Sequence, residues 1–279
     1  MAARSAMILL AVFGSPVAHS LSPRIHRRFA RQVGLEVEYA AIETTPDEFA
    51  AQVRSLADRG GRGCNITVPF KQAGGRLAAR CSDGAARARA ANTLVFESPA
   101  DWYADNTDGP GLVDDLQGPL RRQLDGARVC LLGAGGAAAG VVAALLAAGV
   151  ARLVIANRTP APARDLAARH ADPGRVEART LEELDPAAPF DLLINATSMG
   201  HRGTAPTIAP AWLTADGLCY DLNYGKSAEP LRQACAQADL PYSDGLGMLV
   251  AQAACSFELW TGRKPDAAAV LAELRGEAS

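Results

Sequence analysis

The sequence predicts an α/β protein built from two domains, because apolar segments of strand length alternate with helical segments along its 279 residues. Hydrophobic residues make up 49% of the chain, which is ample for two buried cores. A strand, a glycine-rich turn and an alanine-rich helix stand together near the middle, at residues 128–142. The chain before that turn is long enough to form a domain of its own.

Charge, cysteines and histidines exclude several kinds of partner. The net charge of −2 offers no electrostatic attraction for a nucleic acid or an anionic membrane. The six cysteines form no CxxC pair, as expected for free thiols in a reducing compartment, and the four histidines lack the spacing of metal ligands. The apolar run at residues 7–13 leads straight into a glycine turn, which predicts a strand rather than a signal peptide. We therefore expect a cytoplasmic protein without a metal ion or a membrane span.

The first part of the chain is expected to carry a mainly parallel sheet. Strands are predicted at residues 7–13, 37–42, 64–68 and 91–96, and helices after residue 22, at 46–59, within 71–90 and at 111–124. Ser22 is the expected cap of the first helix, and Pro23 suits its first turn. Pro69 ends the third strand because it cannot donate to a sheet ladder. Lys71 therefore follows the carboxyl end of a strand, where open α/β sheets bind ligands.

The glycine turn is typical of a dinucleotide-binding, or Rossmann-type, unit. Gly133, Gly135 and Gly136 lie where a buried strand turns into a helix, and they leave room for a pyrophosphate at the helix N-terminus. Ala138 occupies the third glycine position of the usual spacing, where a small residue still permits close packing. The alternative is an ordinary glycine turn.

The following strand, at residues 152–156, ends in Asn157, Arg158 and Thr159 instead of the acidic residue that holds the ribose of NAD. A guanidinium can bind two oxygens of a 2′-phosphate, so Arg158 favours NADP, although it could also be a solvated surface residue. Further strands are predicted at 192–197 and 218–223, and helices at 229–238, 246–260 and 266–275. The segments 160–163 and 185–189 are expected to be surface connections.

Eight short motifs follow one another in a specific order. They are Ser20-Leu-Ser22, Asn65-Ile-Thr-Val-Pro-Phe-Lys71, Ala91-Asn-Thr93, Asn106-Thr-Asp108, Gly133-Ala-Gly-Gly136, Asn157-Arg-Thr159, Asn195-Ala-Thr-Ser198 and Asp244-Gly-Leu-Gly-Met-Leu-Val-Ala-Gln252. Each motif is modest alone, but the ordered set is highly specific. From Phe13 to Gly262 the chain resembles the shikimate dehydrogenase family.

The resemblance implies two α/β domains with the active site in the cleft between them. Residues 1–109 with 246–279 would bind shikimate, and residues 110–245 would form the Rossmann-type NADP domain. The implied reaction is the reversible reduction of 3-dehydroshikimate to shikimate by NADPH, in the route through chorismate to the aromatic amino acids.

The resemblance also implies a catalytic pair, Lys71 and Asp108. Hydride transfer to a ring ketone leaves negative charge on the oxygen, and a lysine ammonium can stabilise that oxygen and protonate it. A neighbouring carboxylate can orient the lysine. Taken singly, Lys71 could be a surface lysine and Asp108 a charge at a helix N-terminus.

Further family positions are implied to hold the substrate's carboxylate and hydroxyls. These positions are Ser20, Ser22, Thr67, Asn92, Tyr224 and Gln252, with Lys71 and Asp108. From spacing alone, Ser22 could be only a helix cap and Ser20 a loop residue. Gln252 interrupts an apolar helix, and such an amide needs a partner, which could also be backbone.

Another set of positions is implied to contact NADP(H). They are Asp83, Gly133, Ala134, Gly135, Gly136, Ala137, Asn157, Arg158, Thr159, Thr197, Leu222 and Gly245. Two departures remove positive charge near the 2′-phosphate, because Ala139 and Pro162 stand where the family often has Arg or Lys. NADP preference would then depend mainly on Arg158, with Arg164 a possible substitute, and we expect it to be weaker than usual.

Two other functions stay open. A paralogue could act on quinate or an amino-substituted shikimate, although Ser20 and Ser22 favour shikimate over the bulkier quinate. A protein of another class, a non-catalytic shikimate sensor, would not need the intact Lys71 and Asp108. The partner is in each case a small molecule, and we expect a monomer or a homodimer.

Overall fold

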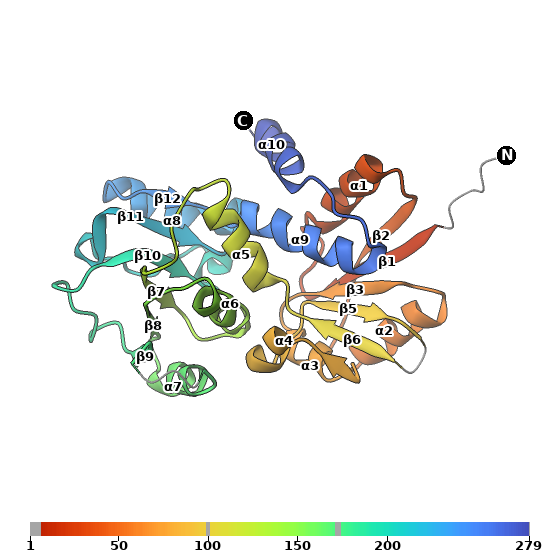
Figure 1. Ribbon diagram of the computed structural model, residues 1–279, viewed down its shortest axis with the longest axis horizontal. Coiled ribbons are helices and arrows are strands. Elements are labelled where there is room, and N and C mark those ends of the chain that lie inside the picture. The colour runs from red at the N-terminus through yellow and green to blue at the C-terminus, as the bar shows by residue number, and fades with distance from the viewer. Residues whose placement is uncertain (1–6, 99–100, 171–173, 279) are drawn as a thin grey trace. The chain divides into compact units, whose positions relative to one another are not determined.

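A computed structural model describes residues 7–98, 101–170 and 174–278 (Figure 1). The chain forms two compact units, one of residues 1–111 with 249–279 and one of residues 112–248. It passes from the first unit to the second within helix α5 (Asp108–Gln117) and returns within helix α9 (Leu246–Thr261). Both units are α/β, as the sequence predicts.

The first unit contains a six-stranded sheet in the order β2-β1-β3-β5-β6-β4. Strand β5 is antiparallel to β3 and β6, whereas the other neighbours are parallel. The prediction of a mainly parallel sheet is therefore confirmed. The strands are β1 (Ile8–Gly14), β2 (Val37–Glu43), β3 (Gly63–Ile66), β4 (Arg80–Cys81), β5 (Thr93–Phe96) and β6 (Trp102–Asp105).

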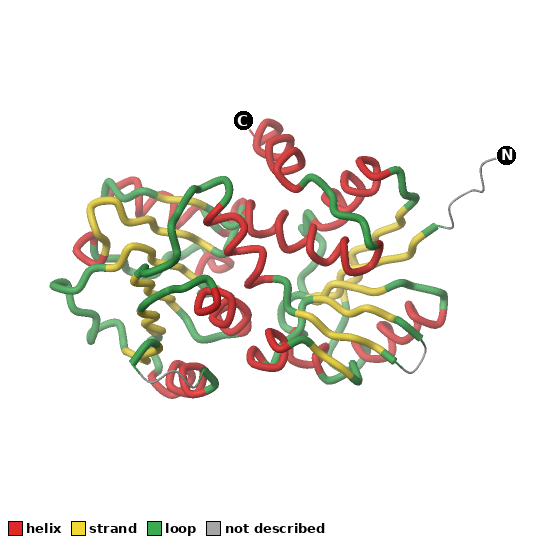
Figure 2. Tube along the Cα trace, viewed as in Figure 1, coloured by secondary structure: helices red, strands yellow, loops and turns green. Residues whose placement is uncertain are grey.

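Helices flank this sheet, as the red and yellow tubes of Figure 2 show. They are α1 (Ser22–Val33), α2 (Phe49–Asp58), α3 (Lys71–Gly75), α4 (Asp83–Ala88) and α10 (Ala267–Ala278), with the first turn of α5 and most of α9. Aromatic side chains fill the core between sheet and helices: the Phe49 and Phe70 rings stack with centroids 4.9 Å apart, and Phe13 packs edge-on against Phe49. This core holds the carboxyl ends of β1 and β3 in place.

The second unit contains a fully parallel sheet in the order β12-β11-β10-β7-β8-β9. This is the order of a doubly wound dinucleotide-binding domain, whose strand order reverses between its two halves. The strands are β7 (Arg128–Leu132), β8 (Arg152–Ala156), β9 (Val176–Arg179), β10 (Phe190–Asn195), β11 (Leu213–Asp221) and β12 (Tyr242–Ser243). The helices are α6 (Gly136–Ala147), α7 (Pro160–Ala168) and α8 (Glu229–Gln237), with short 3₁₀ helices at Met199–Arg202, Pro210–Trp212 and Gly225–Ser227.

Two local predictions are wrong. Residues 160–163 are not a surface connection but the first turn of α7, because a proline in the first turn costs the helix no internal hydrogen bond. Ser22 is not the cap of α1: Leu21 precedes the helix, Ser22 is its first residue, and the Ser20 hydroxyl accepts the Ser22 N–H at 3.2 Å. The first N–H of the helix is thus satisfied by the Ser20 side chain rather than by a cap at Ser22.

Candidate active site

The predicted catalytic pair is in direct contact in the first unit. Lys71 opens α3 after β3, and Asp108 is the first residue of α5. Lys71 Nζ lies 2.5 Å from Asp108 Oδ2, and the two side chains are only 16% and 8% exposed. The other carboxylate oxygen, Oδ1, accepts a hydrogen bond from Asn92 Nδ2 at 2.9 Å. Both carboxylate oxygens are therefore held, and the ammonium is fixed beside them.

Asn92 connects this pair to α9. Its Nδ2 group is shared among Asp108, the Thr107 hydroxyl at 2.9 Å and Gln252 Oε1 at 3.1 Å. Its Oδ1 accepts the Thr107 N–H at 2.8 Å. Asn92 is buried, so these contacts replace those it would make with water. Four predicted site residues, Lys71, Asp108, Asn92 and Gln252, thus form one connected polar cluster.

The Gln252 amide has both kinds of partner that the sequence left open, a polar side chain and a backbone group. Its Oε1 accepts from Asn92, while its Nε2 donates to the Leu249 carbonyl at 2.9 Å. Gly111 lets α5 approach this part of α9, because a Cβ at residue 111 would lie 2.6 Å from the Gln252 backbone nitrogen. The crossing of the two helices therefore fixes where the Gln252 amide lies.

A second layer of polar side chains supports the cluster, and the sequence reasoning did not single it out. Ser256, one turn beyond Gln252, lies 2.7 Å from the Thr93 hydroxyl and accepts from Asn65 Nδ2 at 3.0 Å. Asn65 Oδ1 in turn accepts the Tyr39 hydroxyl at 2.7 Å. The sequence contains a signal for this layer, because Ser256 stands four residues after Gln252 and so lies on the same face of a largely apolar helix.

Ser20, Ser22 and Thr67 lie near the carboxyl ends of β1 and β3. Ser22 is buried, whereas Ser20 and Thr67 are partly exposed. The Thr67 N–H donates to the Phe13 carbonyl at 2.9 Å, which ties this residue to the end of β1. Gly14 makes that approach possible, because a Cβ there would lie 2.3 Å from the Thr67 methyl carbon. These hydroxyls therefore stand at the edge of the sheet where ligands bind.

The glycine turn of the second unit fits a pyrophosphate. Gly133 has φ +102°, and a Cβ there would meet the Ala196 carbonyl group at 3.2 Å, so only glycine suits the position. Apart from the adjoining residues and the helix's own backbone, no described atom lies within 4 Å of a Cβ placed on Gly135 or Gly136. Their backbone therefore faces open space at the start of the twelve-residue helix α6, whose first N–H groups point outward. Ala134 and Ala137 are partly exposed beside them.

The end of β8 carries the residues predicted for the 2′-phosphate. Asn157 Nδ2 donates to the Thr159 carbonyl at 2.8 Å, which shapes the turn, and Arg158 is exposed. Arg164 is also exposed, on α7, whereas Ala139 is only 6% exposed on α6. An exposed guanidinium at this strand end suits a phosphate, and the buried methyl group of Ala139 supplies none of the positive charge that the family often has there.

The remaining predicted cofactor positions fall in two places. Thr197, Leu222 and Gly245 follow β10, β11 and β12 of the second unit, at the carboxyl edge of its sheet. Asp83 instead lies in the first unit, exposed in the first turn of α4. Tyr224, predicted for the substrate, belongs to the second unit and is partly exposed after β11.

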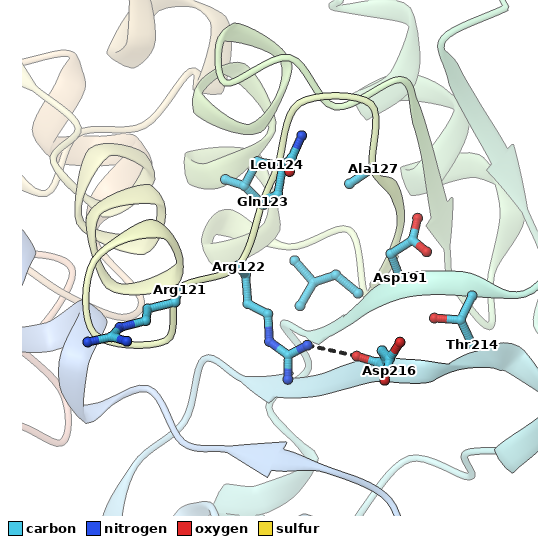
Figure 3. Close-up of a pocket in the computed structure, with 9 residues that line it drawn as sticks. Arg121, Arg122, Gln123, Leu124, Ala127, Asp191, Thr214 and Asp216 are labelled. Atoms are coloured by element: carbon cyan, nitrogen blue, oxygen red, sulfur yellow. Dashed lines mark hydrogen bonds between the residues drawn. The ribbon is translucent and has the colours of Figure 1, made fainter.

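A small cavity of about 230 Å³ lies at the opposite, amino-terminal edge of the second sheet (Figure 3). It is lined by Arg121, Arg122, Gln123, Leu124, Ala127, Asp191, Leu192, Thr214 and Asp216. Arg122 already donates to the Asp216 carbonyl at 2.7 Å. None of its lining residues belongs to the predicted site.

Within the described residues, no group of three or more His, Cys, Asp or Glu side chains is arranged to hold a metal ion. In the same part of the chain, no helix combines the length and the apolar character that crossing a membrane requires.

Three family models together match most of the chain. They are described as the shikimate dehydrogenase substrate binding domain at residues 12–94, shikimate / quinate 5-dehydrogenase at residues 116–203, and the shikimate 5′-dehydrogenase C-terminal domain at residues 245–275. A relative from Xanthomonas oryzae, named shikimate dehydrogenase (NADP(+)), is 46% identical over 268 residues, which are 95% of this chain and 94% of the relative.

Solved structures with the same fold cover nearly the whole chain. The Ael1 enzyme from Pseudomonas putida is 42% identical with a TM-score of 0.87, over 96% of this chain and 98% of that one. Shikimate 5-dehydrogenase from Thermus thermophilus, in complex with NADP(H) and shikimate, is 33% identical with a TM-score of 0.82, over 96% of this chain and 99% of that one.

Proposed function

Because the chain belongs to the shikimate dehydrogenase family, we propose that it catalyses the reversible reduction of 3-dehydroshikimate to shikimate with NADPH. The reaction would serve the route through chorismate to the aromatic amino acids. The single observation that carries the proposal is the contact of Lys71 Nζ with Asp108 Oδ2 at 2.5 Å, at the ligand-binding edge of the first sheet. An ammonium held in this way suits a reaction in which a ketone oxygen gains negative charge.

Lys71 acts as the general acid in the direction of reduction. When bound, NADPH would supply the hydride for the ring carbonyl carbon. Lys71 Nζ stabilises the negative charge that develops on the carbonyl oxygen and transfers a proton to it, so that the ketone becomes an alcohol. In the reverse direction the neutral amine takes the hydroxyl proton, and the same atom thus serves both directions.

Asp108 and Asn92 hold the lysine in place. Asp108 Oδ2 contacts the ammonium, while Asn92 fixes Oδ1 and prevents the carboxylate from rotating. Asp108 would also accept a hydrogen bond from the substrate hydroxyl next to the reacting carbon.

The other polar side chains of the first unit recognise a small, highly oxygenated ring. We propose that residues 1–109 with 246–279 bind the substrate, through the hydroxyls of Ser20, Ser22 and Thr67 and the amides of Asn92 and Gln252. The family resemblance adds Tyr224 from the second unit. Hydroxyl and amide groups match the hydroxyls and the carboxylate of shikimate because each can donate or accept as the ligand requires.

The second unit, in our proposal residues 110–245, holds NADP(H). The N–H groups at Gly135, Gly136 and Ala137 would bind the pyrophosphate, and Arg158 the 2′-phosphate. The remaining predicted contacts are Asp83, Gly133, Ala134, Asn157, Thr159, Thr197, Leu222 and Gly245. The enzyme would act in the cytoplasm, as a monomer or a homodimer that analytical ultracentrifugation distinguishes.

Product analysis tests the proposal. The protein is incubated with 3-dehydroshikimate and NADPH, and the products are separated by chromatography against authentic standards. We expect one molecule of shikimate for each NADPH consumed. Loss of NADPH without shikimate, or the absence of any turnover, would contradict the proposal and favour another substrate or the sensor.

A further inference from the structure

A buried carboxylate lies at the carboxyl edge of the second sheet, on the strand next to the edge strand β12. Asp221 ends β11, and its side chain is 0% exposed. One of its oxygens, Oδ1, accepts three hydrogen bonds: from Asn195 Nδ2 at 2.9 Å, from the Asn223 backbone N–H at 3.0 Å and from Asn223 Nδ2 at 2.8 Å. A single oxygen thus joins the residue that ends β10 to the turn that follows β11.

Through the two asparagines, these contacts link the segments that follow β10, β11 and β12. Asn195 Oδ1 accepts both the N–H and the hydroxyl of Thr197, at 3.0 and 2.7 Å. The Asn223 carbonyl accepts the Gly245 N–H at 2.9 Å, and Asn223 Nδ2 donates to the Thr197 carbonyl at 3.2 Å. Thr197 and Gly245, both predicted cofactor contacts, are therefore held by groups that Asp221 orders, and a third such contact, Leu222, is covalently next to it.

These segments belong to the half of the sheet that would receive the nicotinamide. The glycine turn and Arg158 follow β7 and β8, in the half that binds the pyrophosphate and the adenosine phosphate. In a doubly wound domain the other mononucleotide falls to the second half, here β10 to β12. The ends of β10 and β11 are thus the expected surroundings of the reactive ring.

The carboxylate is charged at neutral pH even though it is buried. Burial raises the pKa of Asp221 to about 6, and the like charge of Asp244 contributes to this rise. The hydrogen bonds from Asn223 and Asn195 act in the opposite direction and lower the pKa. The other titratable groups that interact with it are Tyr242 on β12, Cys219 on β11 and Cys235 on α8. Among the described residues, none donates a hydrogen bond to the second oxygen, Oδ2. The negative charge is thus held by amide groups alone.

We propose, on the basis of the proposed function, that Asp221 is a positioning residue for the nicotinamide and that its charge favours the oxidised cofactor over the reduced one. The oxidised nicotinamide ring carries a positive charge and the reduced ring is neutral. A buried negative charge attracts the former more strongly than an exposed charge would, because water screens it less. This attraction would assist hydride transfer from NADPH to the substrate, which is the direction of biosynthesis.

The test compares Asp221→Asn with the wild-type protein in binding experiments without substrate. Dissociation constants for NADP⁺ and NADPH are measured by calorimetry on the full chain. We expect Asp221→Asn to weaken NADP⁺ about tenfold and NADPH by about threefold or less, as loss of a charged acceptor predicts. Asp216→Asn is the matched control, because it removes the same charge from an exposed position of the same strand.

A pH series adds a second signature. In the wild-type protein the preference for NADP⁺ should fade as the pH drops through about 6, because Asp221 becomes protonated there. In Asp221→Asn it should stay constant. The 2′-phosphate also titrates near this pH, but it is common to both forms of the cofactor and cancels in the ratio of their dissociation constants.

Melting temperatures separate positioning from a merely structural role. The folded-state pKa of Asp221 lies above its unfolded value, so the ionised group costs stability above about pH 6. Asp221→Asn should therefore melt no lower than wild type at pH 8. If it nevertheless fails to fold, Asn223→Ala removes a donor and keeps the charge, and it should weaken both forms of the cofactor by the same factor.

Three outcomes overturn the inference. They are unchanged binding of both forms in Asp221→Asn, equal weakening of both, and a shift of the same size in Asp216→Asn. If the folded wild-type protein binds neither form, the proposed function fails first, which distinguishes the two failures.

Discussion

Replacing Lys71 by alanine is the perturbation that tests the proposed chemistry most sharply. The side chain is the only described ammonium in contact with Asp108, and it is 16% exposed. Its removal takes away the proton donor and leaves the backbone of α3 in place. We expect kcat to fall while shikimate still binds.

The magnitude follows from two effects that the structure separates. Proton transfer by a positioned side chain contributes about 10²–10⁴-fold, so kcat should fall to about a thousandth. Removal of the ammonium also leaves the Asp108 carboxylate, 8% exposed, with Asn92 as its remaining side-chain partner. Loss of one partner of a buried pair costs about 3–5 kcal/mol, and the Asn92 hydrogen bond places the cost at the lower end of that range.

The assay combines initial rates, shikimate binding by calorimetry and urea unfolding. Lys264→Ala is the matched control, because Lys264 is an exposed lysine of the same unit. The double variant Lys71→Ala/Asp108→Asn should recover most of the lost stability, since it removes the unpaired charge, but none of the activity. A Lys71→Ala variant that keeps kcat within about tenfold of wild type would refute the role of the lysine.

Three further predictions concern the cofactor, acid stability and the substrate loop. Arg158→Ala should lower kcat/KM for NADP about ten- to a hundredfold and leave NAD nearly unchanged, and an equal loss for both would show that Arg158 does not bind the 2′-phosphate. Burial lowers the pKa of His26 to about 3, so the unfolded chain takes up a proton below pH 6.5 that the folded chain refuses. Stability should therefore fall by about 2 kcal/mol between pH 6.5 and pH 5, and urea unfolding of His26→Phe should lose this dependence; the same slope in both proteins would contradict it. Gly14→Ala should raise KM for shikimate but not for NADP, because the Thr67 methyl group must move away from the new Cβ. Gly276→Ala, at an open position, should change neither KM, and an unchanged KM in Gly14→Ala would remove Thr67 from the site.

The second unit could be predicted closely because its signals are local. The strands β7, β8 and β10 are buried on both faces and read as continuous apolar runs, and the glycine turn requires a backbone that only glycine adopts easily. Four short strands, β4, β6, β9 and β12, escaped prediction. The two-residue strands β4 and β12 exist only through their neighbours in the sheet. Local pattern carries no information about such pairing.

The candidate site was less predictable because its contacts join distant residues. The sequence placed Lys71 at a strand end, but the hydrogen bond between the side-chain amides of Asn92 and Gln252 spans 160 positions and depends on how α9 crosses α5. Their residue types were informative, whereas their mutual geometry was not. Asp221 passed unnoticed at the end of an apolar strand, although a lone carboxylate there signals a buried polar centre.

The most direct test of the central claim is the initial rate of NADPH formation, followed by the near-ultraviolet absorbance of reduced nicotinamide. Shikimate and quinate are each offered with NADP and with NAD. We predict fast turnover with shikimate and NADP, and at most slow turnover with the other three pairs. Equal or faster turnover with quinate or with NAD would contradict it, and no turnover with any pair would leave the sensor as the better explanation.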